Sequence, residues 1–211
     1  MDKKKLKVAL EKALEDKGKR KFKQSVELVL NFKGVNFSKA ENRINIDVFL
    51  PKGKGGKEPK IAIFADENTA AQYKNLGVDL IIGPNNIESY SSPAKLKDLA
   101  EKYTMFSQPN LIGTVAKHLG QYLGKRGKMP KPLVGNPKEI IERARSSVRI
   151  VTKGKYLPTL QAFVGTEEMS IEDLMENAES IYEAITKKQI AIHNFKSIYV
   201  KLTMGSTVRV M

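Results

Sequence analysis

Residues 51–65 read PKGKGGKEPKIAIFA, and the pattern of hydrophobic residues changes in the middle of this stretch. Residues 51–59 hold only proline, glycine, lysine and one glutamate, a composition typical of an exposed linker. Residues 61–65 are continuously apolar, as in a strand of a parallel sheet that is covered on both faces. The stretch therefore predicts a boundary between two domains of different architecture.

The part of the chain before this boundary predicts a helix followed by antiparallel strands. Residues 3–14 place leucine and alanine at helical spacing between lysines. Residues 25–30 and 43–50 alternate apolar with polar side chains, so each predicts a strand with one packed face and one polar face. We expect these two strands to pair with each other.

The part after the boundary alternates between short strands and helical patterns. Strands are expected at 61–65, 78–82 and 103–107, and each precedes a segment with turn or helix-start residues. This β-α-β-α order predicts a small parallel sheet with helices on its faces. Its helices are expected at 67–76, 93–102, 111–123 and 137–145.

Alternating strand patterns return after this α/β segment, at 147–151, 160–164 and 198–203, with a helix from Ser170 to Ile185. The α/β segment therefore interrupts a domain that both chain ends build. We predict a discontinuous domain of residues 1–59 and 149–211 and an inserted domain of residues 60–148. The two crossings, near 51–60 and 147–155, would form a hinge that the glycines of the first make easy to bend.

Charge indicates the class of partner. The chain has 211 residues, of which 41% are hydrophobic, enough to bury a core. Its 37 lysines and arginines exceed its 23 acidic residues and give a net charge of +14. Such a field concentrates polyanions at the surface, and nucleic acid is the expected partner. The absence of cysteine fits a reducing cytoplasm, and no apolar run is long enough to span a bilayer or act as a signal peptide.

Signatures of catalysis are missing from the sequence. Residues 120–126 read GQYLGKR, which lacks the spacing and the hydroxyl of a phosphate-binding P-loop. No GxSxG pattern occurs, and His118 and His193 stand apart from other metal ligands in the sequence. We therefore expect no enzyme activity, cofactor or metal. Two alternatives remain open: a nucleotide-using α/β enzyme and a nonspecific basic scaffold.

Two clusters of cations are candidate phosphate-binding sites, since lysine and arginine contacts fix the position of a nucleic acid backbone. The first surrounds Phe22 and holds Lys17, Lys19, Arg20, Lys21 and Lys23. The second lies between glycines and prolines that predict a loop over residues 124–132. It holds Lys125, Arg126, Lys128 and Lys131.

Four stretches carry a resemblance to a known family. LGKRGKMPKP at 123–132 resembles the LGPRGLMPNPK loop of the large-subunit ribosomal protein L-one family, and TMGSTVRV at 203–210 resembles its TMGPSVRI ending. FKSIYV at 195–200 and KFKQSVEL at 21–28 resemble the family's last strand and its KFDETVEV strand. The stretches occur in the family's order and extend over most of the chain, with a short N-terminus and lysine-rich loops of the archaeal type.

The resemblance implies an α/β (α+β) fold. It comprises a split antiparallel sheet with helices on one face and an inserted, Rossmann-like three-layer domain. It also implies a cytoplasmic, ribosome-bound protein that is a monomer when free. Its expected partners are large-subunit rRNA at the stalk beside the tRNA exit site, deacylated tRNA at that site, and its own mRNA. Release of that tRNA and repression of that mRNA are the implied activities.

The resemblance also implies which residues bind RNA. The last strand would lie beside residues 21–30, and the rRNA or mRNA surface would consist of Lys21, Phe22, Ser25, Glu27, Lys196, Ser197, Thr203, Met204, Gly205, Ser206 and Thr207. Hydroxyls here could exchange hydrogen bonds with ribose 2′-OH groups. Gly205 would allow close approach or a positive φ. Ser206 stands where the family usually has proline, which would loosen the turn.

Overall fold

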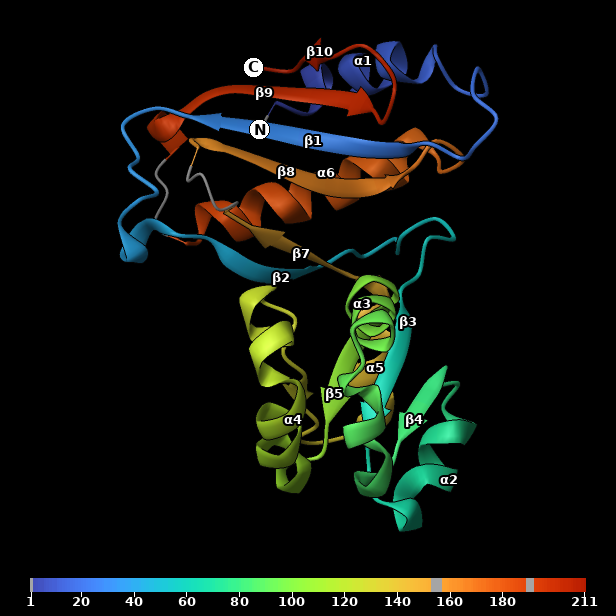
Figure 1. Ribbon diagram of the computed structural model, residues 1–211. Coiled ribbons are helices and arrows are strands. Elements are labelled where there is room, and N and C mark those ends of the chain that lie inside the picture. Colours follow the sequence, from blue (N-terminus) through green and yellow to red (C-terminus); the bar gives the residue numbers. More distant parts are fainter. Residues whose placement is uncertain (1, 153–156, 189–191) are drawn as a thin grey trace. The chain divides into compact units, whose positions relative to one another are not determined.

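The computed structural model describes residues 2–152, 157–188 and 192–211 (Figure 1). The chain forms two compact units: unit 1 is Met1–Glu58 with Ser146–Met211, and unit 2 is Pro59–Arg145. The second boundary falls three residues before the expected one, because β7 (Ser147–Val151) pairs within unit 1 from its first residue. Part of the second expected crossing, residues 153–156, lies outside the described residues.

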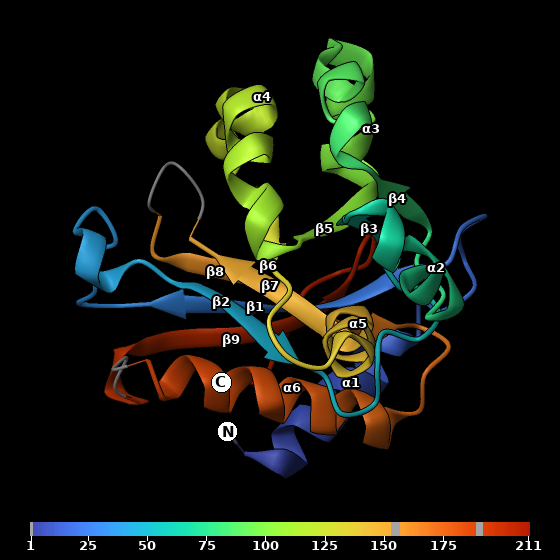
Figure 2. The same cartoon turned by 90° about the horizontal axis from the view of Figure 1, so that it is seen from below.

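Unit 1 is built on a four-stranded antiparallel sheet in the order β10-β9-β1-β8. Its strands are β1 (Ser25–Phe32), β8 (Thr159–Thr166), β9 (Phe195–Leu202) and β10 (Val208–Arg209). Figure 2 shows α1 (Lys3–Leu14) and α6 (Ile171–Thr186) along one side of these strands. Alternate residues of β1, from Val26 to Phe32, are buried with both helices in one core. The other face of the sheet carries the partly exposed polar residues.

The predicted pairing of the first two strands is wrong. β2 (Asn45–Phe49) does not join β1 but pairs with β7, with Val48 opposite Val148 in the antiparallel register. β1 instead lies between β8 and β9, both from the far end of the sequence. The alternation fixed the packed face of each strand, and Ile44, Val48 and Leu50 are buried as predicted. It held no information on which strand would be the neighbour.

Residues 51–57 are not the free linker that their composition indicates. The buried side chain of Asn177 accepts from the backbone N–H of Lys52 at 3.1 Å and donates to the carbonyl of Gly53 at 3.0 Å. Thr166 Oγ1 donates to the carbonyl of Gly55 at 3.0 Å. These hydrogen bonds hold residues 52–55 within unit 1, so this part of the first crossing is packed and is not an exposed linker.

Unit 2 is a three-layer α/β unit with a parallel sheet in the order β4-β3-β5-β6. Its strands are β3 (Lys60–Phe64), β4 (Leu80–Ile82), β5 (Tyr103–Ser107) and β6 (Lys131–Pro132). α3 (Pro93–Lys102) and α4 (Ile112–Lys125) form a core on one face. α2 (Glu67–Asn75) and α5 (Pro137–Ser146) form a second core on the other.

Short 3₁₀ turns complete the described elements, at Ala40–Asn42, Pro84–Asn86, Glu88–Ser91, Pro109–Leu111 and Ile192–Asn194. The fold class predicted from the sequence is confirmed: the described residues form a mixed α/β protein with a four-stranded antiparallel sheet, a four-stranded parallel sheet and the two-stranded antiparallel sheet of β2 and β7. In the described part of the chain, no helix is long and apolar enough to cross a membrane.

Candidate nucleic-acid interface

The pairing of β1 with β9 brings the first strand and the chain end together (Figure 1). Val26 lies opposite Leu202, so Ser25 and Thr203 face each other just beyond the pair. The N–H of Thr203 donates to the carbonyl of Ser25 at 3.0 Å, and the N–H of Ser25 donates to Thr203 Oγ1 at 3.0 Å. The predicted RNA-binding residues at the two ends of the sequence are therefore neighbours in space.

The hydroxyl of Thr203 is already engaged inside the protein. Its oxygen accepts from the N–H of Ser25, and its proton is donated to the Ser25 carbonyl at 3.4 Å. A hydroxyl has one hydrogen and two acceptor lone pairs, so it keeps at most one lone pair for a ligand. Thr203 therefore acts mainly as a link that fixes the tail to β1.

Ser25 is oriented by a lysine that sequence reasoning had placed in a linker. Lys57 Nζ donates to Ser25 Oγ at 2.8 Å and to the carbonyl of Lys23 at 2.7 Å. Because Ser25 Oγ accepts this bond, its own proton is directed elsewhere. Lys57 thus adds a cation beside Ser25 at the surface.

Met204 and Phe22 are the apolar side chains of this region that remain in contact with solvent. Met204 is 59% exposed and Phe22 is 49% exposed. The backbone of Met204 is nonetheless fixed, because its N–H donates to Gln24 Oε1 at 3.1 Å. Exposed large apolar groups among cations are the kind of contact that packs on a sugar or base face.

Gly205 and Ser206 complete the turn after β9. Gly205 does not adopt a positive φ, which excludes the first of its two expected roles. A Cβ at Gly205 would instead lie 3.0 Å from the Leu202 Cβ and 3.6 Å from Asp16 Oδ2, so glycine allows a close approach within the chain.

Ser206 is tied to Asp16. Asp16 accepts from Lys19 Nζ at 2.6 Å, and this hydrogen bond, together with the lysine charge, lowers the pKa of the Asp16 carboxyl. The backbone N–H of Ser206 also donates to this carboxylate and lowers the same pKa further. A proline in this position could not make this bond.

Glu27 lies on the sheet face that the helices leave open. It is partly exposed, and its register partners are Lys201 on β9 and Phe163 on β8. Opposite charges on directly opposed residues of an antiparallel pair stabilise each other. Lys201 Nζ donates to the Thr203 carbonyl at 3.1 Å, so the lysine charge lies on this face of the sheet near Glu27, although among the described residues no ion pair joins the two. We call the residues gathered at this end of the sheet the tail surface: Lys21, Phe22, Ser25, Glu27, Thr203, Met204, Gly205, Ser206 and Thr207.

Lys196 and Ser197 do not join the tail surface. Ser197 pairs in register with Asn31, at the opposite end of β1 from Ser25. It accepts from Asn31 Nδ2 at 3.0 Å and is 7% exposed. Thr203 comes six positions further along the chain, which is about 20 Å away in an extended strand. Ser197 and Thr203 are close in the sequence, but an extended strand places residues six positions apart far from each other.

The basic loop between α1 and β1 divides into paired and unpaired cations. Lys19 binds Asp16, and Lys23 binds Glu168. Among the described residues no ion pair involves Lys17, Arg20 or Lys21, all of which are exposed. These three are therefore available to phosphates.

The second basic cluster is more ordered than the predicted loop. α4 extends to Lys125, and Gly127, with φ of 62°, lets Lys128 N–H donate to the Leu123 carbonyl at 2.8 Å, as at a helix C-terminus. Arg126 stacks on Tyr122 at 4.3 Å from the ring centroid. Lys131 lies in β6 rather than in a loop. The four cations belong to unit 2.

The carboxyl end of the parallel sheet does not favour a phosphate. Ligands of such sheets bind where the strand order reverses, here between β3 and β5. That place is filled by internal hydrogen bonds: Gln108 Oε1 accepts from Asp66 N–H at 2.9 Å, and Asn110 Nδ2 donates to the Asp66 carboxylate at 2.9 Å. Asp66 and Glu67 also put carboxylates at the N-terminus of α2, where a phosphate would be repelled.

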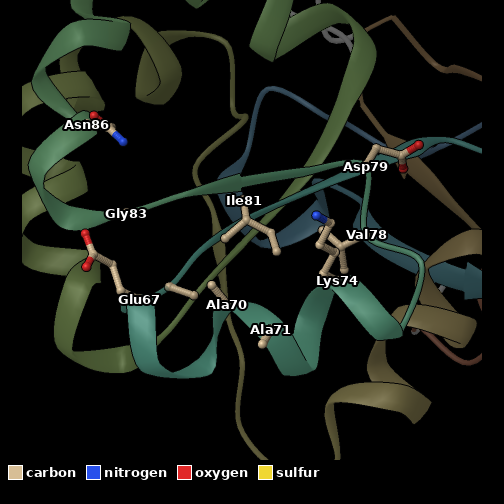
Figure 3. Close-up of a pocket in the computed structure, with 10 residues that line it drawn as sticks. Glu67, Ala70, Ala71, Lys74, Val78, Asp79, Ile81, Gly83 and Asn86 are labelled. Atoms are coloured by element: carbon tan, nitrogen blue, oxygen red, sulfur yellow. The ribbon is translucent and has the colours of Figure 1, made fainter.

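A cavity of about 420 Å³ lies on the other side of α2, against the edge strand β4 (Figure 3). Figure 3 shows Ala70 and Ala71 of α2 and Ile81 of β4 lining it, with Glu67 at one end and Asp79 at the other. Two carboxylates and one lysine, Lys74, give it no phosphate-binding character. Among the described residues no cluster of three or more histidines and carboxylates could hold a metal ion.

Comparison with known proteins assigns the family. Residues 10–206 match the ribosomal protein L1p/L10e family. The chain belongs to this family. The large ribosomal subunit protein uL1 of Thermococcus kodakarensis is 41% identical over 214 residues, covering 99% of this chain and 98% of that protein.

Two further archaeal relatives have the same name. The uL1 protein of Methanothermobacter thermautotrophicus is 39% identical, covering 96% of this chain and 97% of its own length. That of Archaeoglobus fulgidus is 38% identical, covering 100% and 99%. As a member of this family the chain is a ribosomal protein of the cytoplasm and not an enzyme, so the nucleotide-using enzyme alternative is wrong.

Sequence reasoning missed four residues of the interface: Asp16, Gln24, Lys57 and Glu167. Gln24 and Glu167 are buried, at 1% and 5% exposure. Gln24 accepts from the N–H of Met204, and Glu167 is linked to the tail surface only through Gln24. The position of Gln24 inside the KFKQSVEL motif was the available signal for it. Nothing in the sequence around Glu167 indicates that it lies beside the first strand.

Proposed function

We propose that this ribosomal protein binds a folded helix of large-subunit rRNA through the tail surface. The observation that carries the proposal is the exposure of Met204 on a turn whose backbone is held by hydrogen bonds, together with the exposure of Phe22 next to Lys21 in the loop before β1. RNA helices expose ribose hydroxyls and phosphates in a shallow groove, so shape and a few polar contacts decide recognition. A turn whose backbone is fixed by hydrogen bonds, and which carries hydroxyls and an apolar side chain near cations, suits that target.

The cations and the turn have separate roles. Lys17, Arg20 and Lys21 contact phosphates and set the salt dependence of binding, without reading the RNA. Met204, Ser206 and Thr207, all exposed, contact riboses or bases and give the preference for one helix. Removing a lysine lowers affinity for every RNA, whereas removing Met204 lowers it chiefly for the rRNA helix.

The test is filter binding with a stalk rRNA fragment and a control duplex of the same length. Met204→Ala should lower affinity for the stalk fragment by roughly tenfold and leave the control duplex unchanged. Lys52→Ala is the matched surface control, because Lys52 faces Asp173 and Glu176 on α6. Equal small losses in both variants would count against the tail surface as the recognition site.

Three further proposals rest on the family resemblance. The same surface would bind a copy of the rRNA site on the protein's own mRNA and repress its translation. The unit 2 cations Lys125, Arg126, Lys128 and Lys131 would contact exit-site tRNA and aid its release. The free protein would be a monomer. Toeprinting on the mRNA tests the repression, and tRNA dissociation from ribosomes tests the release. Sedimentation tests whether the free protein is a monomer.

A nonspecific basic scaffold is the second candidate, because many of the chain's lysines are exposed. Its mark would be a steep dependence of affinity on salt together with equal affinity for the stalk fragment and the control duplex. The two candidates therefore predict different results in the same assay.

A further inference from the structure

Glu167 is a carboxylate buried in the turn between β8 and α6, at 5% exposure. Its Oε1 accepts from the N–H of Gln24 at 3.1 Å. Its Oε2 accepts from Gln24 Nε2 at 3.2 Å and from the N–H of Gly18 at 3.4 Å. Three N–H groups thus converge on one carboxylate, which stabilises a buried acceptor that has left water.

Gln24, which Glu167 holds in place, also hydrogen-bonds the tail. It is 1% exposed, and its Oε1 accepts from the N–H of Met204 at 3.1 Å. Its Nε2 also lies 3.3 Å from the carbonyl of Asp16 as a donor, and its own carbonyl accepts from Glu167 N–H at 3.1 Å. Because Glu167 takes the amide nitrogen, the amide oxygen of Gln24 is directed at Met204.

The pair therefore joins three segments that are distant in sequence. The loop after α1 contributes Gly18 and Asp16, the turn before α6 contributes Glu167, and the tail contributes Met204. Two of these segments carry the tail surface. Neither Glu167 nor Gln24 is accessible to RNA.

We infer that Glu167 and Gln24 are positioning residues that hold the basic loop and the Met204 turn in their RNA-binding geometry before RNA arrives. The inference rests on the proposed function and extends it to two residues that touch no ligand. A surface ordered in advance loses less conformational entropy on binding. It follows that disrupting the buried pair lowers affinity for the stalk fragment although the surface residues are unchanged.

Glu167→Gln is the decisive variant. It keeps the size of the side chain but turns one acceptor into an amide donor, which then faces N–H groups of Gln24 or Gly18. Affinity for the stalk fragment should fall by roughly tenfold. Glu172→Gln, in the exposed first turn of α6, removes the same charge and is the matched control. It should not lower affinity, since losing a negative charge alone favours RNA.

Amide hydrogen exchange separates positioning from general destabilisation. It is measured at a temperature where circular dichroism shows both variants folded. The Met204 amide should exchange faster in Glu167→Gln, while core amides of α6 and β9 keep their protection. The salt dependence of binding should not change, because the phosphate contacts remain. If Glu167→Gln does not fold, Gln24→Met, which removes the acceptor of Met204 N–H, takes its place in the binding assay.

Two results would overturn the inference: a folded variant with wild-type affinity for the stalk fragment, or an affinity loss in Glu167→Gln with unchanged exchange at Met204. Failure of the proposed function looks different. In that case Met204→Ala itself would retain full preference for the stalk fragment, whatever the Glu167 variant does.

Discussion

At the scale of single residues, the tail surface depends on hydrogen bonds made by the backbone more than on its side-chain list. The N–H groups of Thr203, Met204 and Gly205 all donate within the chain, to Ser25, Gln24 and Leu202. The side chains of Met204, Ser206 and Thr207 are left exposed on this held backbone. The residue types suit RNA, and the hydrogen bonds fix where they point.

Thr203 should tolerate serine but not valine. Thr203→Ser keeps the oxygen that accepts from Ser25 N–H, whereas Thr203→Val keeps the shape and leaves that donor without its acceptor. Losing one such bond costs about 1–2 kcal/mol of unfolding free energy. Urea unfolding of the two variants measures the difference. Equal stability would mean that the link between Thr203 and Ser25 is not significant.

Ser206 should be replaceable by alanine and not by proline in this chain. Ser206→Ala keeps the N–H that donates to Asp16, and Ser206→Pro removes it. We expect a lower melting temperature only for Ser206→Pro at neutral pH. The folded-state pKa of Asp16 is lowered, so its ionised carboxylate stabilises the folded protein. This contribution to stability is complete above the usual pKa of 3.8 and is lost as pH falls through the lowered pKa.

Melting curves of the two Ser206 variants from neutral pH downward measure this. The difference between them should shrink in the acid range below pH 3.8. A proline variant that melts at or above the wild-type temperature at neutral pH would contradict the role of Asp16. It would show that the fixed φ of proline outweighs the lost hydrogen bond.

At the scale of elements, residues 51–57 are the segment whose composition is most misleading. Proline, glycine and lysine indicate a flexible linker, yet Asn177 and Thr166 hydrogen-bond its backbone. Composition reports what a segment would do in isolation. It does not report the buried acceptors and donors that other elements offer it.

Gly55→Ala should destabilise the protein more than Gly53→Ala. Both glycines have positive φ, at 61° and 66°, so both substitutions add similar backbone strain. A Cβ at Gly55 would also lie 2.3 Å from Thr166 Oγ1, whereas nothing lies within 4 Å at Gly53. We expect about 1 kcal/mol of lost unfolding free energy for Gly53→Ala and about 2–4 kcal/mol for Gly55→Ala. Equal losses in thermal or urea unfolding would mean that the segment is not packed.

Lys54 should make stability depend on pH. Burial lowers its pKa from 10.5 to about 8, against the opposing charges of Glu58 and Asp47. Between these two values the unfolded chain holds a proton at Lys54 that the folded chain has released, so stability rises with pH across this window. Lys54→Met should remove this rise. Parallel slopes for the wild type and the variant between pH 8 and 10.5 would contradict it.

The sequence predicts strands and helices better than it predicts their neighbours. Alternation identified β1 and β2, because side-chain period is a local property, but it paired them wrongly. The contact of β1 with β9 came from the family resemblance. The contact between Gln24 and Glu167 could not be predicted, since it is set by the packing of segments about 140 residues apart.

At the scale of the whole molecule, the described residues include a candidate RNA-binding surface with cations in each unit. The tail surface belongs to unit 1, and Lys125, Arg126, Lys128 and Lys131 belong to unit 2. A net charge of +14 would attract RNA to either. The two surfaces differ in the groups that lie beside their cations. In unit 1 these are an exposed methionine and hydroxyls on a turn whose backbone is fixed by hydrogen bonds, and in unit 2 the cations lie at a helix end.

Methionine methyl NMR distinguishes the two surfaces directly, since Met204 lies in the tail surface and Met129 lies among the unit 2 cations. With methyl-labelled protein, the stalk rRNA fragment should shift and broaden the Met204 signal and leave the buried Met105 unchanged. A control duplex of the same length should not affect Met204. A Met204 signal that stays in place when the stalk fragment is bound would contradict the account, most clearly if Met129 shifts instead.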